Sequence, residues 1–442
     1  MKKLLLSFLL VMVIASGFAQ WSINPKANRA VVGSGNTMRS NSSVSDGAGG
    51  LVIVFEESVW DGINMVGFTQ IFAQRVSSGG VAQWAAPVLI ATCPDYTDKR
   101  VVSDGAGGVV VLWVQKLTQG NNQPEKIYAQ RLNQNGAKQW GATGKELTAM
   151  FSSYYISEML FDNNSFVYSF AQYGAGDGDV FIQKLDMNGN VQWGTGTKIN
   201  EGVGEYDGRI FKDGAGYLVA LVEEYEFNNG NDEGTRLYLQ KVNADGTKNG
   251  SNVFIDDLVP INGIEYYPEE VIYDGNGGLY YTTSAADDND DTNVKLYLQH
   301  ITSTGVKQFT STLWGLEVDA NAGAVIDGGG YSYWTYSASM ASDGAGGVVI
   351  GWIDTRNANA GVYAQRYNSA GAKLWGATDL LLSPGVVDYF DQQSIQFDAN
   401  GDLVFRLQKS LGYAKQYLYV QKTSLSGTLL YPTARTADHL FL

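Results

Sequence analysis

The sequence is poor in the residues that most often carry disulfide and zinc chemistry. Its 442 residues include one cysteine, Cys93, and two histidines, His300 and His439. A single cysteine excludes an intramolecular disulfide, so the fold has to be held by burial and hydrogen bonding. With only two histidines, the chain offers few residues for a histidine-rich zinc site or a Ser-His-Asp triad. We therefore expect no cofactor of these kinds, and we interpret Cys93 as an ordinary thiol in a loop and His300 as a structural residue.

Basic residues are scarce relative to acidic ones. The chain has 30 lysines and arginines against 45 aspartates and glutamates, and its formal net charge is -15. Nucleic acids and anionic membrane surfaces both attract clustered lysine and arginine. The charge balance therefore disfavours both as partners, and it is typical of a soluble protein or of one that meets cations.

Long apolar runs are absent except near the start of the chain. Leu4 to Ala15 follows Lys2 and Lys3 and precedes the segment 16–19. This run is shorter than the roughly 20 residues that span a bilayer, so it predicts a cleavable signal peptide over residues 1–19. We expect an exported protein, periplasmic, cell-surface or extracellular, without membrane insertion, whose residues 20–442 form one domain.

Glycine is abundant, with 53 residues, and part of it repeats in a fixed pattern. The string Ser45-Asp46-Gly47-Ala48-Gly49-Gly50 returns at 103–108 and 342–347, each time before a β-branched and aromatic run, and weaker copies lie between. The seven copies are headed by Asp46, Asp104, Asp162, Asp213, Asp274, Asp343 and Asp398. Because glycine adopts positive φ without steric cost, an Asp-Gly dipeptide between β-rich runs predicts a hairpin at each copy.

A second repeated element follows each turn and is anchored on glutamine. The glutamines are Gln74, Gln130, Gln183, Gln240, Gln299, Gln365 and Gln421. Six residues later stand Gly80, Gly136, Gly189, Gly246, Gly305, Gly371 and Gly427. Ten residues after the glutamine stand Trp84, Trp140, Trp193, Gly250, Phe309, Trp375 and Tyr431. The glycine predicts a second hairpin, and the aromatic residue predicts packing between neighbouring sheets.

Each repeat is therefore predicted to form strand a, the Asp-Gly turn, strand b, a variable loop, strand c, the glycine turn, and strand d carrying the aromatic residue. Seven such units without helical periodicity favour an all-β fold, a seven-bladed β-propeller of four-stranded antiparallel blades. The long connection from Thr310 to Ser339 favours the order a to d within one blade. Closure of the last blade stays open, because Gln20-Trp21 and residues 425–431 both resemble strand d.

The pairing of these elements resembles a known group of proteins. A D-G-x-G-G turn with a Y-A-Q-R-x-x-x-x-G-x-x-x-W stretch, as in Tyr128 to Trp140, is similar to the β-propeller repeat families of bacterial secreted proteins. The second half is also distantly similar to quinoprotein-type propeller repeats. The likeness covers residues 21–442 and implies structural roles for the repeated residues, without implying an activity.

In an up-and-down blade, the a–b and c–d turns lie at one end and the variable b–c and d–a loops at the other. Binding sites usually form on variable loops of a rigid scaffold. Tyrosines stand seven to nine residues before six of the seven turn aspartates. The candidate ligand-binding residues on this basis are Tyr96, Tyr155, Tyr206, Tyr267, Tyr336 and Tyr389. Their rings either stack on sugars or on a partner's side chains at the channel mouth, or pack between blades.

Acidic residues gather at the same end of the predicted blades. The candidate metal ligands, all in the fifth b–c loop, are Asp287, Asp288, Asp290 and Asp291. Glu223 and neighbouring acids lie in or beside the fourth b–c loop. Clustered carboxylates bind Ca²⁺, but Thr292 stands where an EF-hand loop needs glycine and Leu298 where it needs the closing glutamate. A calcium site and a solvated acidic loop both fit this pattern.

No constellation of residues in the sequence selects a catalytic mechanism. The pattern favours a non-enzymatic binding or scaffold module that recognises a polysaccharide or a protein partner through the variable-loop face. The alternatives are an extracellular carbohydrate-active enzyme, a hydrolase or lyase with acidic residues at the channel mouth, and a purely structural cell-envelope protein. These hypotheses differ in whether a ligand binds and whether it is turned over.

Overall fold

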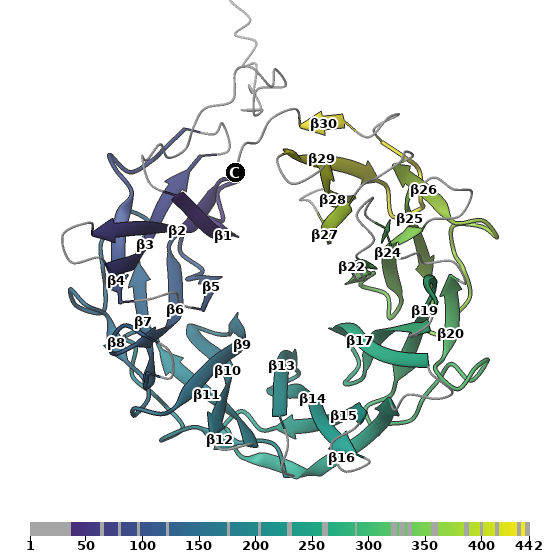
Figure 1. The fold of residues 1–442 in the computed structure, drawn as a ribbon, viewed down its shortest axis with the longest axis horizontal. Coiled ribbons are helices and arrows are strands. Elements are labelled where there is room, and N and C mark those ends of the chain that lie inside the picture. Colours follow the sequence, from purple (N-terminus) through teal and green to yellow (C-terminus); the bar gives the residue numbers. More distant parts are fainter. Residues whose placement is uncertain are drawn as a thin grey trace, which may run out of the picture.

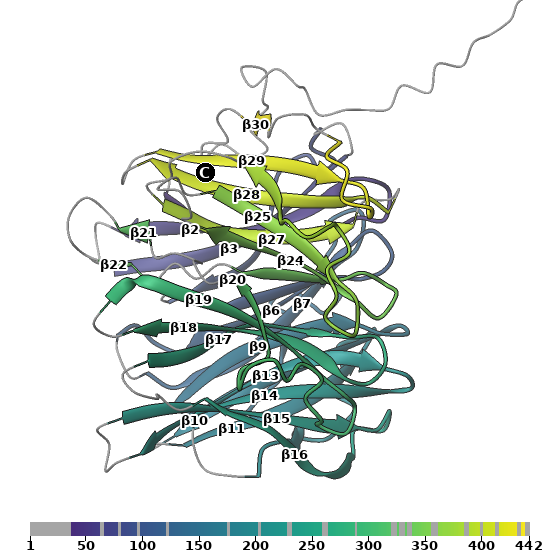
Figure 2. The ribbon, with the colours of Figure 1, turned by 90° about the vertical axis from the view of Figure 1, so that its right-hand side faces the viewer.

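Four-stranded antiparallel sheets are arranged radially in the computed structural model (Figures 1 and 2). The structure describes residues 37–437 except for 62–65, 78–80, 95–97, 121–122, 175–176, 202–204, 228–231, 259–263, 288–289, 320–324, 327–331, 334–337, 355–360, 384–388, 398–400, 412–414 and 431–434. These residues form seven sheets of four strands that are consecutive in the sequence, and one two-stranded hairpin. The fold is a seven-bladed β-propeller, which confirms the prediction from the repeats.

The first four blades have the following strands. Blade 1 contains β1 (Thr37–Ser45), β2 (Leu51–Asp61), β3 (Val66–Val76) and β4 (Val88–Cys93). Blade 2 contains β5 (Lys99–Ser103), β6 (Val109–Lys116), β7 (Glu125–Leu132) and β8 (Lys145–Glu146). Blade 3 contains β9 (Ser153–Phe161), β10 (Ser165–Gly174), β11 (Asp177–Asp186) and β12 (Thr197–Lys198). Blade 4 contains β13 (Glu205–Asp213), β14 (Gly216–Phe227), β15 (Asp232–Val242) and β16 (Lys248–Leu258).

The last three blades complete the ring. Blade 5 contains β17 (Ile264–Tyr273), β18 (Leu279–Asp287), β19 (Asp290–Ile301) and β20 (Leu316–Asp319). The hairpin of β21 (Val325–Ile326) and β22 (Ser332–Tyr333) lies in the connection to blade 6. Blade 6 contains β23 (Ser339–Ser342), β24 (Val348–Asp354), β25 (Gly361–Tyr367) and β26 (Leu380–Ser383). Blade 7 contains β27 (Tyr389–Phe397), β28 (Leu403–Leu411), β29 (Lys415–Thr423) and β30 (Arg435–Ala437).

The strands of a blade run outward from the centre of the ring in chain order. In Figure 1, β5, β9 and β13 lie inside, and β8, β12 and β16 lie at the rim. The order a to d is therefore confirmed, and the four described strands of blade 7 all come from the C-terminal end. Gln20-Trp21 and the predicted signal peptide, residues 1–19, lie outside the described residues. The part of the chain that is described contains no helix with the length and apolarity needed to cross a membrane.

The second strand of blade 2 is apolar on both faces because a neighbouring blade covers each face. In β6, Val110 and Leu112 pack against blade 3, whereas Val111 and Trp113 pack against blade 1. A strand that is buried on both faces has a continuous apolar run instead of an alternating one, as residues 109–114 do.

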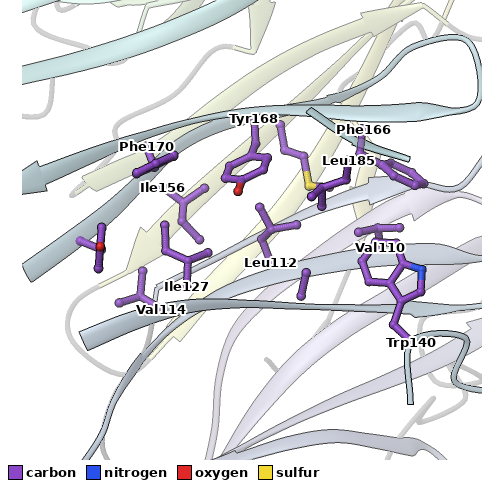
Figure 3. Packing of buried hydrophobic residues seen from close by; sticks show 13 residues of the cluster. Val110, Leu112, Val114, Ile127, Trp140, Ile156, Phe166, Tyr168, Phe170 and Leu185 are labelled. Carbon is purple, nitrogen blue, oxygen red and sulfur yellow. The ribbon is translucent and has the colours of Figure 1, made fainter. Parts of the chain in front are cut away.

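Hydrophobic clusters lie between neighbouring blades and hold the ring together. Figure 3 shows the cluster between blades 2 and 3, where Leu112, Ile127 and Ile156 lie near Tyr168. Such cores are packed as densely as organic crystals, so each joint fixes the relative position of two blades.

The repeated Ser-Asp-Gly-Ala-Gly-Gly string forms the a–b turns. Asp46 Oδ1 accepts the backbone N–H groups of Ala48 (2.8 Å) and Gly50 (2.7 Å). A Cβ atom on Gly50 would lie 2.2 Å from the carbonyl oxygen of Val76, so only glycine fits there. The string is thus a structural turn, as expected.

The aromatic residue does not lie on strand d in the described blades, and that prediction is wrong. Trp84 and Trp140 stand in the c–d connections, before β4 and β8 begin. The reason is that the side chain of the strand c glutamine binds the aromatic residue's backbone: Trp84 N–H donates to Gln74 Oε1 at 3.2 Å. The continuous pairing of β3 with β4 begins only at Val88, after this bond. The prediction that Cys93 lies in a loop is also wrong. Cys93 is the last residue of β4, and its side chain is buried.

Candidate functional site

The turn end of the ring is occupied by bonds between blades. In blade 2, Asp104 Oδ2 pairs with Arg131 Nη2 at 3.0 Å, and the two side chains are 1% and 16% exposed. The same guanidinium donates through Nη1 to the carbonyl oxygen of Met187 in blade 3, at 3.3 Å. Arg75 and Arg366 make the equivalent bonds from blades 1 and 6. The repeated aspartates and arginines therefore link one blade to the next.

His300 takes the arginine position in blade 5 and makes the same link. Its Nε2 lies 3.1 Å from Asp274 Oδ2, and its Nδ1 lies 3.2 Å from the carbonyl oxygen of Ser369 in blade 6. The imidazole also stacks on Tyr280, with ring centroids 4.2 Å apart. These contacts confirm its structural role.

The repeated glutamine and aromatic residue likewise make structural hydrogen bonds. Gln130, which is fully buried, accepts the N–H of Trp140 at 3.0 Å and donates to the carbonyl oxygen of Gly141 at 2.7 Å. The indole of Trp140 donates through Nε1 to Met187 O at 3.0 Å. A ligand site therefore has to be sought away from the repeated turn aspartates, the glutamines and the aromatic residues that follow them.

Tyr155 is an exposed aromatic residue at the other end of an inner strand. It is the third residue of β9, next to the d–a connection, and it is 37% exposed. Its hydroxyl accepts a hydrogen bond of 3.0 Å from Arg100 Nη2, and the Arg100 guanidinium carbon lies 5.3 Å from the ring centroid. Arg100 is in turn held by Asp98 Oδ1 (2.7 Å) and by the carbonyl oxygen of Ser157 (3.1 Å). Arg100 of blade 2 thus holds the exposed aromatic ring of Tyr155 of blade 3 in place.

A polar position recurs on the inner strands, four residues before each turn aspartate. In blade order it holds Ser42, Arg100, Glu158, Arg209, Glu270, Ser339 and Ser394. Blades 2 to 5 therefore carry charges of alternating sign, and blades 1, 6 and 7 carry serine. Sequence reasoning missed this position, although a polar residue stands there in all seven repeats.

Arg209 is the most exposed of the described charges at this position. Its Nη1 lies 4.0 Å from Glu158 Oε2 and its Nε lies 3.9 Å from Asp207 Oδ2, with the three side chains 46%, 35% and 33% exposed. These separations exceed hydrogen-bond length. We define Tyr155, Arg100, Glu158, Asp207 and Arg209 as the inner polar cluster, which extends over blades 2 to 4.

The structure brings four of the predicted tyrosines to inner strands. They are Tyr155 on β9, Tyr206 on β13, Tyr267 on β17 and Tyr389 on β27. For the last three the backbone alone is described, and Tyr96 and Tyr336 lie outside the described residues. Their placement beside the centre of the ring fits the prediction, and a role in binding stays a prediction.

The predicted metal ligands lie at the β18–β19 hairpin. Asp287 and Asp290 pair across it, and Asp291 follows on β19. Asp288 lies outside the described residues, and the side chains of the other three are not described. No group of three histidine, cysteine or acidic side chains able to hold a metal occurs among the described residues. The calcium site stays a prediction.

The acids predicted for the fourth b–c loop lie largely on strands. Glu223, on β14, is 4% exposed and accepts a hydrogen bond of 2.8 Å from the Tyr238 hydroxyl. The strands β14 and β15 extend so far that only residues 228–231 separate them. Glu223 is therefore part of a buried polar pair and not of a solvated loop.

A buried ion pair joins blades 1 and 2. Lys99 Nζ lies 2.6 Å from Glu56 Oε1, and the side chains are 2% and 1% exposed. Cys93 is buried near this pair: burial, together with the charge of Glu56, raises the pKa of its thiol to about 12. A thiol with such a pKa is protonated at neutral pH and a poor nucleophile, so Cys93 behaves as a packing residue.

The radial sheets with this polar inner surface define the class of protein as a seven-bladed β-propeller. No family model matches the chain, and no curated protein matches its sequence. A solved ulvan lyase of polysaccharide lyase family 25 is similar at 9% identity, over 88% of this chain and 92% of that chain, with a TM-score of 0.49. The β-propeller domain of the Trilobed protease from Pyrococcus furiosus has 10% identity, 88% and 97% coverage and a TM-score of 0.42. A protein of unknown function from Dyadobacter fermentans has 11% identity, 86% and 93% coverage and a TM-score of 0.43. Likenesses at this level concern the fold and carry no conclusion about activity.

Proposed function

We propose that the protein is an exported, non-enzymatic binding module that holds a polysaccharide at the variable-loop end of the ring. The exposed ring of Tyr155 carries this proposal. Because Arg100 fixes the Tyr155 hydroxyl, the ring loses little conformational freedom when a flat apolar face of a sugar stacks on it. Among the described side chains, Tyr155 takes no part in the repeated contacts between blades that the tryptophans make.

The remaining members of the inner polar cluster suit a ligand rich in hydroxyl groups. The Arg209 guanidinium stands 3.9 and 4.0 Å from two carboxylates, so a hydroxyl inserted between them can accept from the guanidinium and donate to a carboxylate. Hydrogen bonds to charged partners are stronger than those between neutral groups. Such a surface, with both signs of charge, favours a polyhydroxylated chain over an apolar protein partner.

Binding to glycans is the direct test of this proposal. The purified mature protein is applied to a glycan array and then mixed with the best ligands while reducing ends and unsaturated products are measured. Binding without new products supports the proposal. Binding with product release shows a hydrolase or lyase instead, and the absence of both leaves a protein partner or a purely structural role and overturns the proposal.

Substitution of Tyr155 locates the site. Tyr155→Ala is expected to weaken binding about tenfold, because loss of a stacked ring costs about 1 kcal/mol or more. Tyr155→Phe keeps the ring and should change Kd much less. Phe254→Ala is the matched control, because Phe254 is a 52% exposed aromatic residue on the rim strand β16. Equal losses in the Tyr155 and Phe254 variants, at unchanged melting temperature, would place the site elsewhere.

A further inference from the structure

The joint between blades 7 and 1 differs from the other joints of the ring. In Figure 1 it lies at the top, between β1 and β2 on one side and β27 to β29 on the other. Blades 1 and 7 are the first and last blades along the chain, so no d–a connection ties them together. The described hydrophobic clusters link the other six neighbouring pairs, and none of those clusters spans blades 7 and 1.

Burial on the blade 1 side of this joint is incomplete. Leu51 and Ile53 of β2 face blade 7 and are partly exposed. Ile53 pairs with the strand c glutamine, which identifies the same two positions in every blade. The equivalents are exposed by 2% or less: Val109, Val111, Phe166, Tyr168, Tyr217, Val219, Leu279, Tyr281, Val348, Ile350, Leu403 and Phe405.

Burial on the blade 7 side is incomplete as well. Val404 of β28 pairs with the residue after Gln421 and faces away from blade 6. It is partly exposed. The equivalents in the other six blades are all 0% exposed: Val52, Val110, Val167, Leu218, Tyr280 and Val349. Both surfaces of one joint therefore depart from a pattern that holds in every other blade.

Phe55 follows Ile53 by two residues on the same face of β2, and its side chain is covered. It is 1% exposed and stacks on Phe72 of the same blade, with ring centroids 5.7 Å apart. Trp113 and Tyr128 stack in the same way in blade 2, at 5.8 Å. Leu51 and Ile53 thus stay partly exposed although the following residue on their face of β2 is buried.

We propose that the ring opens at the joint between blades 7 and 1, while the other six joints stay closed. Apolar burial is the main force that holds packed sheets together, so a joint whose described apolar side chains are less buried than their equivalents separates at a lower free energy. Separation here also stretches no d–a connection. This opening does not depend on the proposed ligand, because it is inferred from burial at the joint alone.

Hydrogen exchange of the unmodified mature protein tests the opening. Amides of β2 and β28 are compared with those of the equivalent strands β6 and β24. The expected result is about tenfold or more lower protection in β2 and β28, with exchange independent of global unfolding. Equal protection in the four strands would overturn the proposal.

Thiol labelling gives a second test with a matched control. Ile53→Cys and Ile350→Cys place a thiol at the same position of blades 1 and 6, and Cys93 adds no background because it is buried. A bulky maleimide that cannot enter a packed joint should label the Ile53→Cys variant about tenfold or more faster than the Ile350→Cys variant. Labelling of both only at the rate of global unfolding would contradict an opening joint. If either variant fails to fold, the exchange experiment decides.

Discussion

Gly246 of blade 4 lies directly against the indole of Trp193 of blade 3: a Cβ atom on it would be 2.4 Å from Trp193 Cδ2. The same relation recurs around the ring, with Gly189 against Trp140 and Gly427 against Trp375. The glycine that lies six residues after each glutamine is thus needed for the neighbouring blade as well as for its own turn.

Gly246→Ala should therefore destabilise the protein more than Gly250→Ala. Both glycines have positive φ, +88° and +78°, so both variants carry a backbone cost of about 1–2 kcal/mol. Only Gly246 faces a neighbouring ring, and forced overpacking adds about 1–3 kcal/mol. Chemical denaturation measures the difference, and equal losses would show that the indole moves aside without cost.

Gln130→Leu should lower the free energy of unfolding by about 2–6 kcal/mol. It leaves the buried N–H of Trp140 and the carbonyl of Gly141 without their side-chain partner, at about 1–3 kcal/mol each. Gln240→Leu is the matched control: Gln240 Nε2 donates to the carbonyl oxygen of Gly250 at 3.1 Å, but its Oε1 is buried without a hydrogen-bond partner. Its loss should be smaller, and an equal loss would mean that the glutamine acts through packing alone.

Lys99→Met should destabilise the protein by about 3–5 kcal/mol, because it removes the lysine that pairs with the buried carboxylate of Glu56. Lys126→Met removes one partner of an exposed pair with Glu146, whose side chain is 49% exposed, and should cost much less because solvent screens the pair. Denaturant titrations of the two variants make the comparison. A Lys99→Met variant as stable as Lys126→Met would show that water reaches Glu56.

Stability should fall as the pH drops below about 4. Burial alone would raise the pKa of Asp343, but the N–H groups of Ala345 and Gly347 and the guanidinium of Arg366 lower it further than burial raises it. The pKa of Asp46 is lowered in the same way. A carboxylate with a lowered folded-state pKa stabilises the fold above its unfolded pKa of about 3.9 and loses that contribution as the pH falls through its folded pKa.

Asp343→Asn is the variant that tests this pH dependence. It should lower the melting temperature at pH 6 and should approach the wild-type value at low pH, so its melting profile against pH is flatter. Parallel profiles for the two proteins would assign the acid loss to other carboxylates.

Much of the fold was predictable because the decisive signals are local. The Asp-Gly turns depend on positive φ and on hydrogen bonds between residues less than six positions apart. They can therefore be predicted from residues that are adjacent in the sequence. The candidate site was predictable only in part. Tyr155 was found by its place before a turn, whereas Arg100, which fixes it, lies 55 residues earlier in the chain.

By itself the sequence determined the number of blades, their strand order and the structural role of the repeated aspartate and glutamine, because each depends on backbone geometry and on apolar runs within one repeat. The tertiary structure alone decided that the tryptophans precede strand d, that Arg100 meets Tyr155, and that Leu51, Ile53 and Val404 stay partly exposed. These outcomes depend on how two blades face each other. Contact between blades joins residues that are far apart in the chain, and no local pattern encodes it.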